Sequence, residues 1–189
     1  MKIIHKIYEK YIIKMGLAKI GKNSLIYYPT NLRLKKNIYI GENTTILHGS
    51  RLSSYEDLVN KSSRIIIGDN CYIGYNFSAL AGDDIIIESN VLIASNVLVS
   101  SENHGINPES NIPYMNQDLI TKPVIIKEGA WVGEKAIILP GVIIGKKSVI
   151  AAGSVVTKSI DNYCIAAGIP AKVIKKYNFS KHKWERVEN

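Results

Sequence analysis

Four histidines are the side chains of this chain best suited to move protons near neutral pH, because imidazole titrates in that range. His104 stands in a polar run, Ser-Ser-Glu-Asn-His-Gly, at the start of a segment that interrupts the repeat described below. His5 falls in an expected N-terminal helix, His48 in an early repeat and His182 in the C-terminal tail. We therefore interpret His104 as the candidate for acid–base chemistry and the other three as structural or surface residues.

Cysteine usage and charge bear on other kinds of site. Only two cysteines occur, Cys71 and Cys164, with no Cys-x-x-Cys motif and no clustered histidines, so we expect buried free thiols and no bound metal. The net charge of +8 attracts anions, among them phosphorylated cofactors. Because the lysines are spread along the chain without an aromatic-rich RNA-binding strand or zinc-finger spacing, nucleic acid is not an expected partner.

Length and hydropathy predict one soluble domain over residues 1–189. Apolar residues make up 46% of the chain, and no uninterrupted apolar run is long enough to cross a bilayer. The start, MKIIHKIYEK, interleaves charged with apolar residues, unlike a secretory signal. We therefore expect a cytoplasmic protein.

Aliphatic residues recur at every sixth position in the C-terminal half. A period of six fits neither a 3.6-residue helix nor the simple alternation of one strand. It fits a solenoid with three short strands per coil, in which each aliphatic residue points inward and each corner residue tolerates positive φ. The unbroken run is Ile126, Val132, Ile138, Ile144, Ile150 and Val156, with corners three places later at Gly129, Lys135, Gly141, Lys147 and Gly153.

The same repeat extends toward the N-terminus in shifted phases, so that coils cover residues 20–161. Asparagine reaches the left-handed region easily and occupies four expected corners, Asn70, Asn76, Asn90 and Asn96. Five or six coils result, stacked so that each buries the inner face of the next. The inward positions are Ile67, Ile73 and Ala79, then Ile87, Ile93 and Val99, and in a weaker copy Ile20, Ile26, Leu32, Leu34, Ile40 and Ile46.

Segments outside the repeat are expected at both ends and at two interruptions. Residues 2–16 carry apolar side chains on one helical face and lysines on the other, which predicts a short helix that ends at Gly16. That helix is interpreted as a cap on the first coil, the alternative being weak association with the inner face of the membrane. Residues 162–189 are expected to end in a short helix or tail. The interruptions at 53–63 and 103–123 predict loops, which in compact repeats are often functional.

The run from Trp131 to Tyr177, WVGEKAIILPGVIIGKKSVIAAGSVVTKSIDNYCIAAGIPAKVIKKY, resembles the hexapeptide-repeat acetyltransferases. It is most similar to the maltose and galactoside O-acetyltransferases and to enzymes that acetylate O-antigen and capsular sugars. The resemblance implies an all-β, left-handed parallel β-helix, an exception to the usual right-handed crossover. It also implies a homotrimer whose active sites lie between subunits and transfer acetyl from acetyl-CoA to a sugar or glycan hydroxyl.

The resemblance assigns a general base to the histidine at the start of the protruding loop. In this chain that residue is His104, and Asn103 beside it is expected to orient or polarise the ring. An alcohol is a poor nucleophile at neutral pH, which is why a base is needed. Ser78 stands where the galactoside enzymes carry a second asparagine, and Asp83 follows nearby. Both are expected acceptor contacts, although Asp83 and Asp84 also suit a solvated turn.

The donor side follows from the same resemblance. CoA is expected along a groove between subunits near the later coils, where small residues and backbone groups face the pantetheine arm and an aromatic lines the cleft. Ammonium groups would meet the nucleotide phosphates as point charges. The residues implied are Trp131, Gly133, Ala151, Ala152, Thr157, Lys158, Lys172 and Lys175.

Three alternatives remain open at this point. An N-acetyltransferase acting on an amino sugar or sugar nucleotide would use the same fold and base. A metal-dependent lyase of this fold would need three histidines around zinc, for which only His48 and His104 are candidates. A non-catalytic scaffold would bind no CoA thioester, so the ligand would leave its thermal stability unchanged.

Overall fold

Successive coils stack their inward aliphatic residues directly on one another. In the computed structural model, which describes residues 15–187, Ile67, Ile87 and Ile126 are neighbours across adjacent parallel strands, and each is at most 1% exposed. Burying one isoleucine side chain contributes roughly 1.5–3 kcal/mol, so these stacks form the core. One coil alone would leave its inner face open, and stability therefore depends on the stack.

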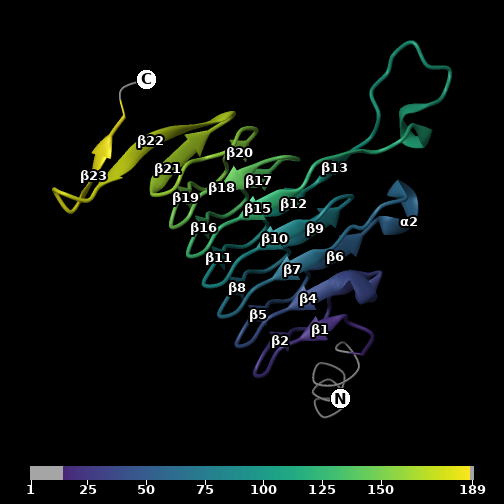
Figure 1. The fold of residues 1–189 in the computed structure, drawn as a ribbon, viewed down its shortest axis with the longest axis horizontal. Helices are drawn as coiled ribbons and strands as arrows, with labels where there is room; N and C mark the ends of the chain where they lie inside the picture. Colours follow the sequence, from purple (N-terminus) through teal and green to yellow (C-terminus); the bar gives the residue numbers. More distant parts are fainter. Residues whose placement is uncertain (1–14, 188–189) are drawn as a thin grey trace.

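Six coils form three parallel sheets, named here A, B and C, and each coil passes through one strand of each (Figure 1). Sheet A contains β1 (Lys19–Ile20), β4 (Ile38–Ile40), β7 (Ile65–Ile67), β10 (Ile85–Ile87), β15 (Val124–Ile126) and β18 (Ile143–Ile144). Sheet B begins with β2 (Leu25–Ile26), β5 (Thr45–Ile46), β8 (Tyr72–Ile73), β11 (Leu92–Ile93), β16 (Trp131–Val132) and β19 (Val149–Ile150). Sheet C contains β3 (Asn31–Arg33), β6 (Arg51–Ser54), β9 (Ser78–Ala81), β12 (Leu98–Ser100), β17 (Ile137–Ile138) and β20 (Val155–Val156). The predicted left-handed parallel β-helix is confirmed.

The predicted corners have the backbone conformation that a corner needs. All nine glycine, asparagine and lysine corners named above have φ between 51° and 82°. The small residue before each inward strand is buried because it lies beneath the backbone of the next coil. Ser148, for example, donates a hydrogen bond of 2.7 Å to the carbonyl oxygen of Asp161.

The prediction that Leu34 points inward is wrong. Leu34 has φ 51° and begins the short 3-10 helix η2 (Lys35–Asn37), and it does not belong to the buried core. The turn between β3 and β4 takes up extra residues, so the second coil turns inward at Ile38, and Ile40 is buried as predicted. The added turn also explains why the early repeat changes phase.

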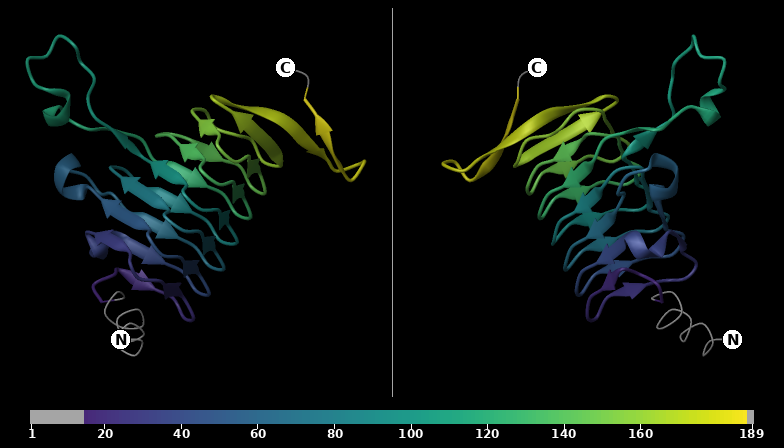
Figure 2. Two further views of the ribbon diagram at one scale, coloured as in Figure 1. Left: turned by 180° about the vertical axis from the view of Figure 1, so that it is seen from behind. Right: turned by 45° about the vertical axis from the view of Figure 1, so that its right-hand side comes forward.

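The longer insertions leave the column at one edge, between sheets C and A, which we call the C–A edge. The first carries α2 (Glu56–Val59) and corresponds to the predicted interruption at 53–63. The second, predicted at 103–123, has an antiparallel stem of β13 (Glu102–Asn103) and β14 (Ile120–Thr121) and includes η3 (Tyr114–Asn116). Figures 1 and 2 show this loop projecting well beyond the column.

The helix considered for the C-terminal segment is wrong, because strands continue sheet B there. The turn at Gly168 reverses the chain between β21 (Cys164–Gly168) and β22 (Ala171–Asn178), and β23 (Lys183–Arg186) adds the last strand, with antiparallel pairing throughout. β21 pairs parallel with β19 and offers an unpaired edge, and pairing with that edge outweighs local helical preference.

The sequence also predicted an N-terminal helix and two buried thiols. The predicted N-terminal helix falls almost entirely outside the described residues, although Gly16 has the positive φ, 83°, expected there. Cys71 and Cys164 are both free and buried, as expected. Burial raises the pKa of the Cys71 thiol, which keeps the sulfur protonated and unreactive. Within residues 15–187, no helix has the length and apolar character required to span a membrane.

Candidate active site

His104 is the first residue beyond the stem of the protruding loop. Glu102 pairs with Thr121 and Asn103 with Ile120. The stem therefore places His104 where β13 and β14 separate. The His104 side chain is exposed and has no hydrogen-bond partner among residues 15–187. Asn103 is exposed too, and its side chain forms no hydrogen bond with the ring in this chain. The imidazole is therefore available to a ligand.

The stem rests on the turn that joins β9 to β10. Ser101 is fully buried, and its hydroxyl donates to the carbonyl oxygen of Asp83 at 2.7 Å and accepts from the Asp83 amide at 3.0 Å. At Gly82 a Cβ would lie only 2.6 Å from the Cβ of Glu102, so glycine is needed there. The stem thus sits directly on the preceding coil.

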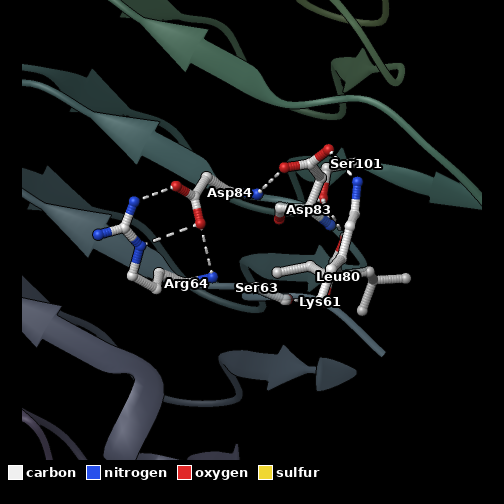
Figure 3. Close-up of polar contacts among 8 residues, drawn as sticks. Lys61, Ser63, Arg64, Leu80, Asp83, Asp84 and Ser101 are labelled. Carbon is white, nitrogen blue, oxygen red and sulfur yellow. Dashed lines mark hydrogen bonds and ion pairs between the residues drawn. The ribbon is translucent and has the colours of Figure 1, made fainter. Parts of the chain in front are cut away.

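Asp83, an expected acceptor contact, uses its carboxylate within the protein (Figure 3). Its Oδ2 atom lies 2.6 Å from Nζ of Lys61, and its Oδ1 atom accepts a 2.8 Å hydrogen bond from the amide of Asp84. The guanidinium of Arg64 pairs with Asp84, which also accepts from the Arg64 amide. Both acids therefore connect the loop that carries α2 to the turn beneath His104, and we assign Asp83 a supporting role.

The side chain of Gln117 forms hydrogen bonds with the backbone elsewhere in the protruding loop. Its Oε1 atom accepts from the amide of Asn107 at 2.9 Å, and its Nε2 atom donates to the carbonyl oxygens of Asn107 and Ile112, each at 3.0 Å. Its side chain also lies against Gly105, where a Cβ would be 2.8 Å from the Gln117 Cβ. Because Gly105 follows His104 directly, Gln117 restrains the backbone that carries the imidazole.

Three of the predicted donor residues meet at a different edge, between sheets B and C, which we call the B–C edge. Gly133 lies beneath Ala151 and Ala152 of the next coil, and its amide donates to the carbonyl oxygen of Ile150 at 2.8 Å. A Cβ at Gly133 would be 2.6 Å from the Ala152 nitrogen and 2.7 Å from the Ile150 oxygen. Only glycine permits this spacing between the coils.

We expect Gly133→Ala to destabilise the fold by about 1–3 kcal/mol, because the added methyl group meets backbone that cannot move aside. The same distortion should raise the KM for acetyl-CoA by shifting Ala151 and Ala152. Thermal unfolding and steady-state kinetics measure the two effects. Gly153→Asn is the control, since a Cβ at Gly153 meets nothing within 4 Å and asparagine adopts its φ of 70°. An equal loss in both variants would refute the packing argument.

The remaining predicted residues are spread over the column. Trp131 is 48% exposed on sheet B. Lys172 and Lys175 lie on β22, and Thr157 and Lys158 follow β20 at the C–A edge. Ser78 lies on β9 opposite Leu98.

Within one chain the predicted base and three of the predicted donor residues stand at opposite edges of sheet C. His104 projects from the C–A edge, whereas Gly133, Ala151 and Ala152 form the B–C edge. Ser78 lies near the start of its strand, away from the C–A edge. A single copy therefore does not assemble the expected site.

A zinc site of the lyase type finds no support in the described part of the chain. Residues 15–187 contain no group of three histidine, cysteine, aspartate or glutamate side chains arranged to hold a metal. His48, the second histidine considered for such a site, contacts the Tyr28 carbonyl oxygen through Nδ1 and stacks on Tyr75 with ring centroids 6.0 Å apart. Its surroundings are those of a structural residue.

Comparison with known families decides the relationship of this chain. Residues 123–158 match the bacterial transferase hexapeptide model, and residues 64–101 match the model for the hexapeptide repeat of succinyl-transferase. The chain is 35% identical over 170 residues to a putative lipopolysaccharide biosynthesis O-acetyl transferase, WbbJ, of Escherichia coli, with 86% of this chain and 84% of that protein covered. The chain belongs to the hexapeptide-repeat acetyltransferases.

Other hexapeptide-repeat relatives include both O- and N-acyltransferases. A galactoside O-acetyltransferase of Lactococcus lactis is 32% identical, with 88% of this chain and 77% of that protein covered. Among solved structures, the N-acyltransferase AntD from Bacillus cereus, in complex with dTDP and coenzyme A, has a TM-score of 0.77 at 26% identity, with 88% of each chain covered. A maltose O-acetyltransferase from Clostridium difficile has a TM-score of 0.59 at 28% identity, covering 88% of this chain and 73% of that one.

The sequence-based reading missed the residues that hold the site in place. Lys61 and Arg64 reach Asp83 and Asp84 from another coil, and Gln117 holds the protruding loop together by hydrogen bonds. No repeat or motif marks these residues. The six-residue repeat predicts which strands of neighbouring coils pair. That pairing is the one feature of the sequence from which the contacts of Lys61 and Arg64 could have been inferred.

Proposed function

We propose that this protein is an O-acetyltransferase that moves an acetyl group from acetyl-CoA to a hydroxyl of a sugar or polysaccharide precursor. The observation that carries the proposal is the exposed imidazole of His104, which has no hydrogen-bond partner among the described residues and begins a loop whose stem is fixed to the column. The chain belongs to an acetyltransferase family, and relatives named for lipopolysaccharide and galactoside O-acetylation support a sugar acceptor.

In this reaction His104 acts as the general base. Its unprotonated ring nitrogen takes the proton from the acceptor hydroxyl while that oxygen attacks the thioester carbonyl carbon. The C–S bond then breaks, and the departing thiolate takes the proton back from the imidazolium. The products are an acetyl ester and free CoA. Because the ring is exposed and has no hydrogen-bond partner within residues 15–187, it needs no rearrangement to accept that proton.

The complete site requires a second copy of the chain. When the C–A edge of one copy faces the B–C edge of the next, His104 approaches Gly133, Ala151 and Ala152 of its neighbour. Such a heterologous contact closes into a ring when repeated by rotation, which supports a homotrimer. Apolar side chains exposed on the loop suit burial against that neighbour: Ile106, Ile112, Tyr114, Met115 and Ile120.

The other expected contacts are part of the same proposal. Thr157 and Lys158 are exposed at the C–A edge, and Lys172 on β22, where each can meet donor phosphates. The Ser78 hydroxyl has no hydrogen-bond partner among the described residues and can bind the acceptor. Asn103 supports the imidazole in the assembled site. Free buried thiols fit a cytoplasmic enzyme, since cytosolic cysteines stay reduced.

The test is release of free CoA from acetyl-CoA with a panel of sugars, sugar nucleotides and lipid-linked oligosaccharides. Acceptor-dependent release with formation of an acetyl ester supports the proposal, and the mass of the native assembly should equal three chains. A protein that neither binds CoA nor releases it with any acceptor would overturn the assignment.

N-acetylation of a sugar nucleotide is the second candidate. It is favoured by the similarity to AntD, an N-acyltransferase solved with dTDP and coenzyme A. A free amine is a better nucleophile than a hydroxyl and needs less help from a base. Product analysis separates the two, because mild alkali cleaves an acetyl ester and leaves an acetyl amide intact.

A further inference from the structure

One row of paired residues crosses successive strands of sheet B and ends in two cations. Trp131 pairs with Val149, Val149 with Ile165, Ile165 with Lys175, and Lys175 with Arg186. At about 4.8 Å between strands, the row extends roughly 19 Å from the tryptophan to the arginine. It passes from an aromatic residue over two aliphatic residues to positive charge, and Figure 1 shows its last two strands leaving the end of the column.

The two cations face each other without a counter-charge. Residues directly opposite in an antiparallel pair have Cβ atoms about 4.5–5.5 Å apart, and like charges there are destabilising. Among residues 15–187, neither Lys175 nor Arg186 has a carboxylate within ion-pair distance. Glu185, the nearest acid along β23, instead pairs with Lys181. A bound anion would neutralise the pair that the strand register creates.

An aromatic cluster adjoins these cations. Trp184 lies opposite Tyr177 on the same two strands, with ring centroids 5.3 Å apart and planes 73° apart. Phe179 supports Tyr177 at 5.0 Å. Trp184 remains 36% exposed, and strand alternation places it on the same face as Arg186. The exposed ring can stack on a planar base next to a phosphate-binding pair.

We propose that the outer face of β22 and β23 binds the phosphorylated adenosine end of the acyl-CoA donor, with Lys175 and Arg186 on its 3′-phosphate and Trp184 against its adenine. This inference rests on the proposed function, and it adds Arg186 and Trp184 to the donor site. The apolar residues of the row, Trp131, Val149 and Ile165, favour this ligand over a simple inorganic anion. CoA joins a weakly polar arm to a nucleotide carrying several phosphates, and the row presents matching surfaces in that order.

The test compares acetyl-CoA with acetyl-dephospho-CoA, which lacks the 3′-phosphate, in the wild type and in Arg186→Gln. Loss of a charge-assisted contact should raise the KM for acetyl-CoA about tenfold with little change in kcat. The KM for acetyl-dephospho-CoA should change much less. Lys183→Gln is the matched control, because it removes the same charge from the opposite face of β23 and should leave both values near those of the wild type.

Equal changes for both donors in Arg186→Gln, or the same change in Lys183→Gln, would overturn this inference. Calorimetric titration with CoA alone separates it from the proposed function. If the wild type binds no CoA, the proposed function itself fails. If wild type and Arg186→Gln bind CoA equally well, the enzyme assignment stands and only the adenosine site is refuted.

Discussion

Replacing His104 by asparagine is expected to lower the rate of acetyl transfer by about 10²–10⁴-fold, because this is the usual contribution of a general base. Asparagine is close in size but cannot accept the proton. The loss should appear in kcat, with the KM for acetyl-CoA nearly unchanged, because the ring acts on the acceptor hydroxyl. Single-turnover and steady-state kinetics measure both quantities.

His182→Asn provides the matched control for His104→Asn. His182 lies in the exposed turn between β22 and β23 at φ 50°, a conformation that asparagine tolerates. The control should retain wild-type turnover, and both variants should keep the native assembly and unfolding temperature, since neither side chain has a hydrogen-bond partner in the described part of the chain. Wild-type turnover in His104→Asn would end the assignment of the base.

Gln117→Ala is expected to reduce kcat by up to about 100-fold, although the side chain is remote from any transferred proton. A displacement near 1 Å at a reacting group can have an effect of that size. The substitution removes three hydrogen bonds that fix Asn107 and Ile112 and opens space beside Gly105. The imidazole should then sample several positions. Because the base itself is unchanged, the shape of the pH profile should be retained while its height falls.

Two further measurements make the Gln117 prediction specific. Limited proteolysis should cut the loop at 105–118 faster in Gln117→Ala than in the wild type, since local opening becomes easier. Asn111→Ala removes an amide from the same loop, and the Asn111 side chain has no hydrogen-bond partner among residues 15–187. That control should behave as the wild type. Full activity in Gln117→Ala, or an equal loss in Asn111→Ala, would contradict a positioning role.

The sequence alone indicated local features of the candidate site and gave little sign of its contacts between coils. His104 could be selected because it starts an interruption of the repeat, and the structure has it at the end of the β13–β14 stem. Asp83 looked equally able to bind a sugar or to sit in a turn. Its pairing with Lys61 follows from how the insertion that carries α2 meets the β9–β10 turn of the next coil, and that depends on the length of the insertion.

The same contrast holds for the last strands. Lys175 could be chosen from its position after the last coil, but nothing in the local sequence indicates that Arg186 lies directly opposite it. Their proximity follows from the turn before β23, which sets the register between β22 and β23. Residues 175–189 alone are compatible with a helix, and the open edge of β21 decides otherwise.

The amino-acid sequence by itself determined the three-sided coil, its corners and, apart from Leu34, its inward residues, because each depends on six consecutive residues and on φ preferences that act locally. Tertiary structure alone decided which loops touch, which acids form ion pairs and which cations face each other, because strand pairing brings together residues that are far apart in the chain. The fold can therefore be predicted from the repeat. The contacts that hold the loop of His104 in place, and the cationic end of sheet B, arise only when the coils are stacked.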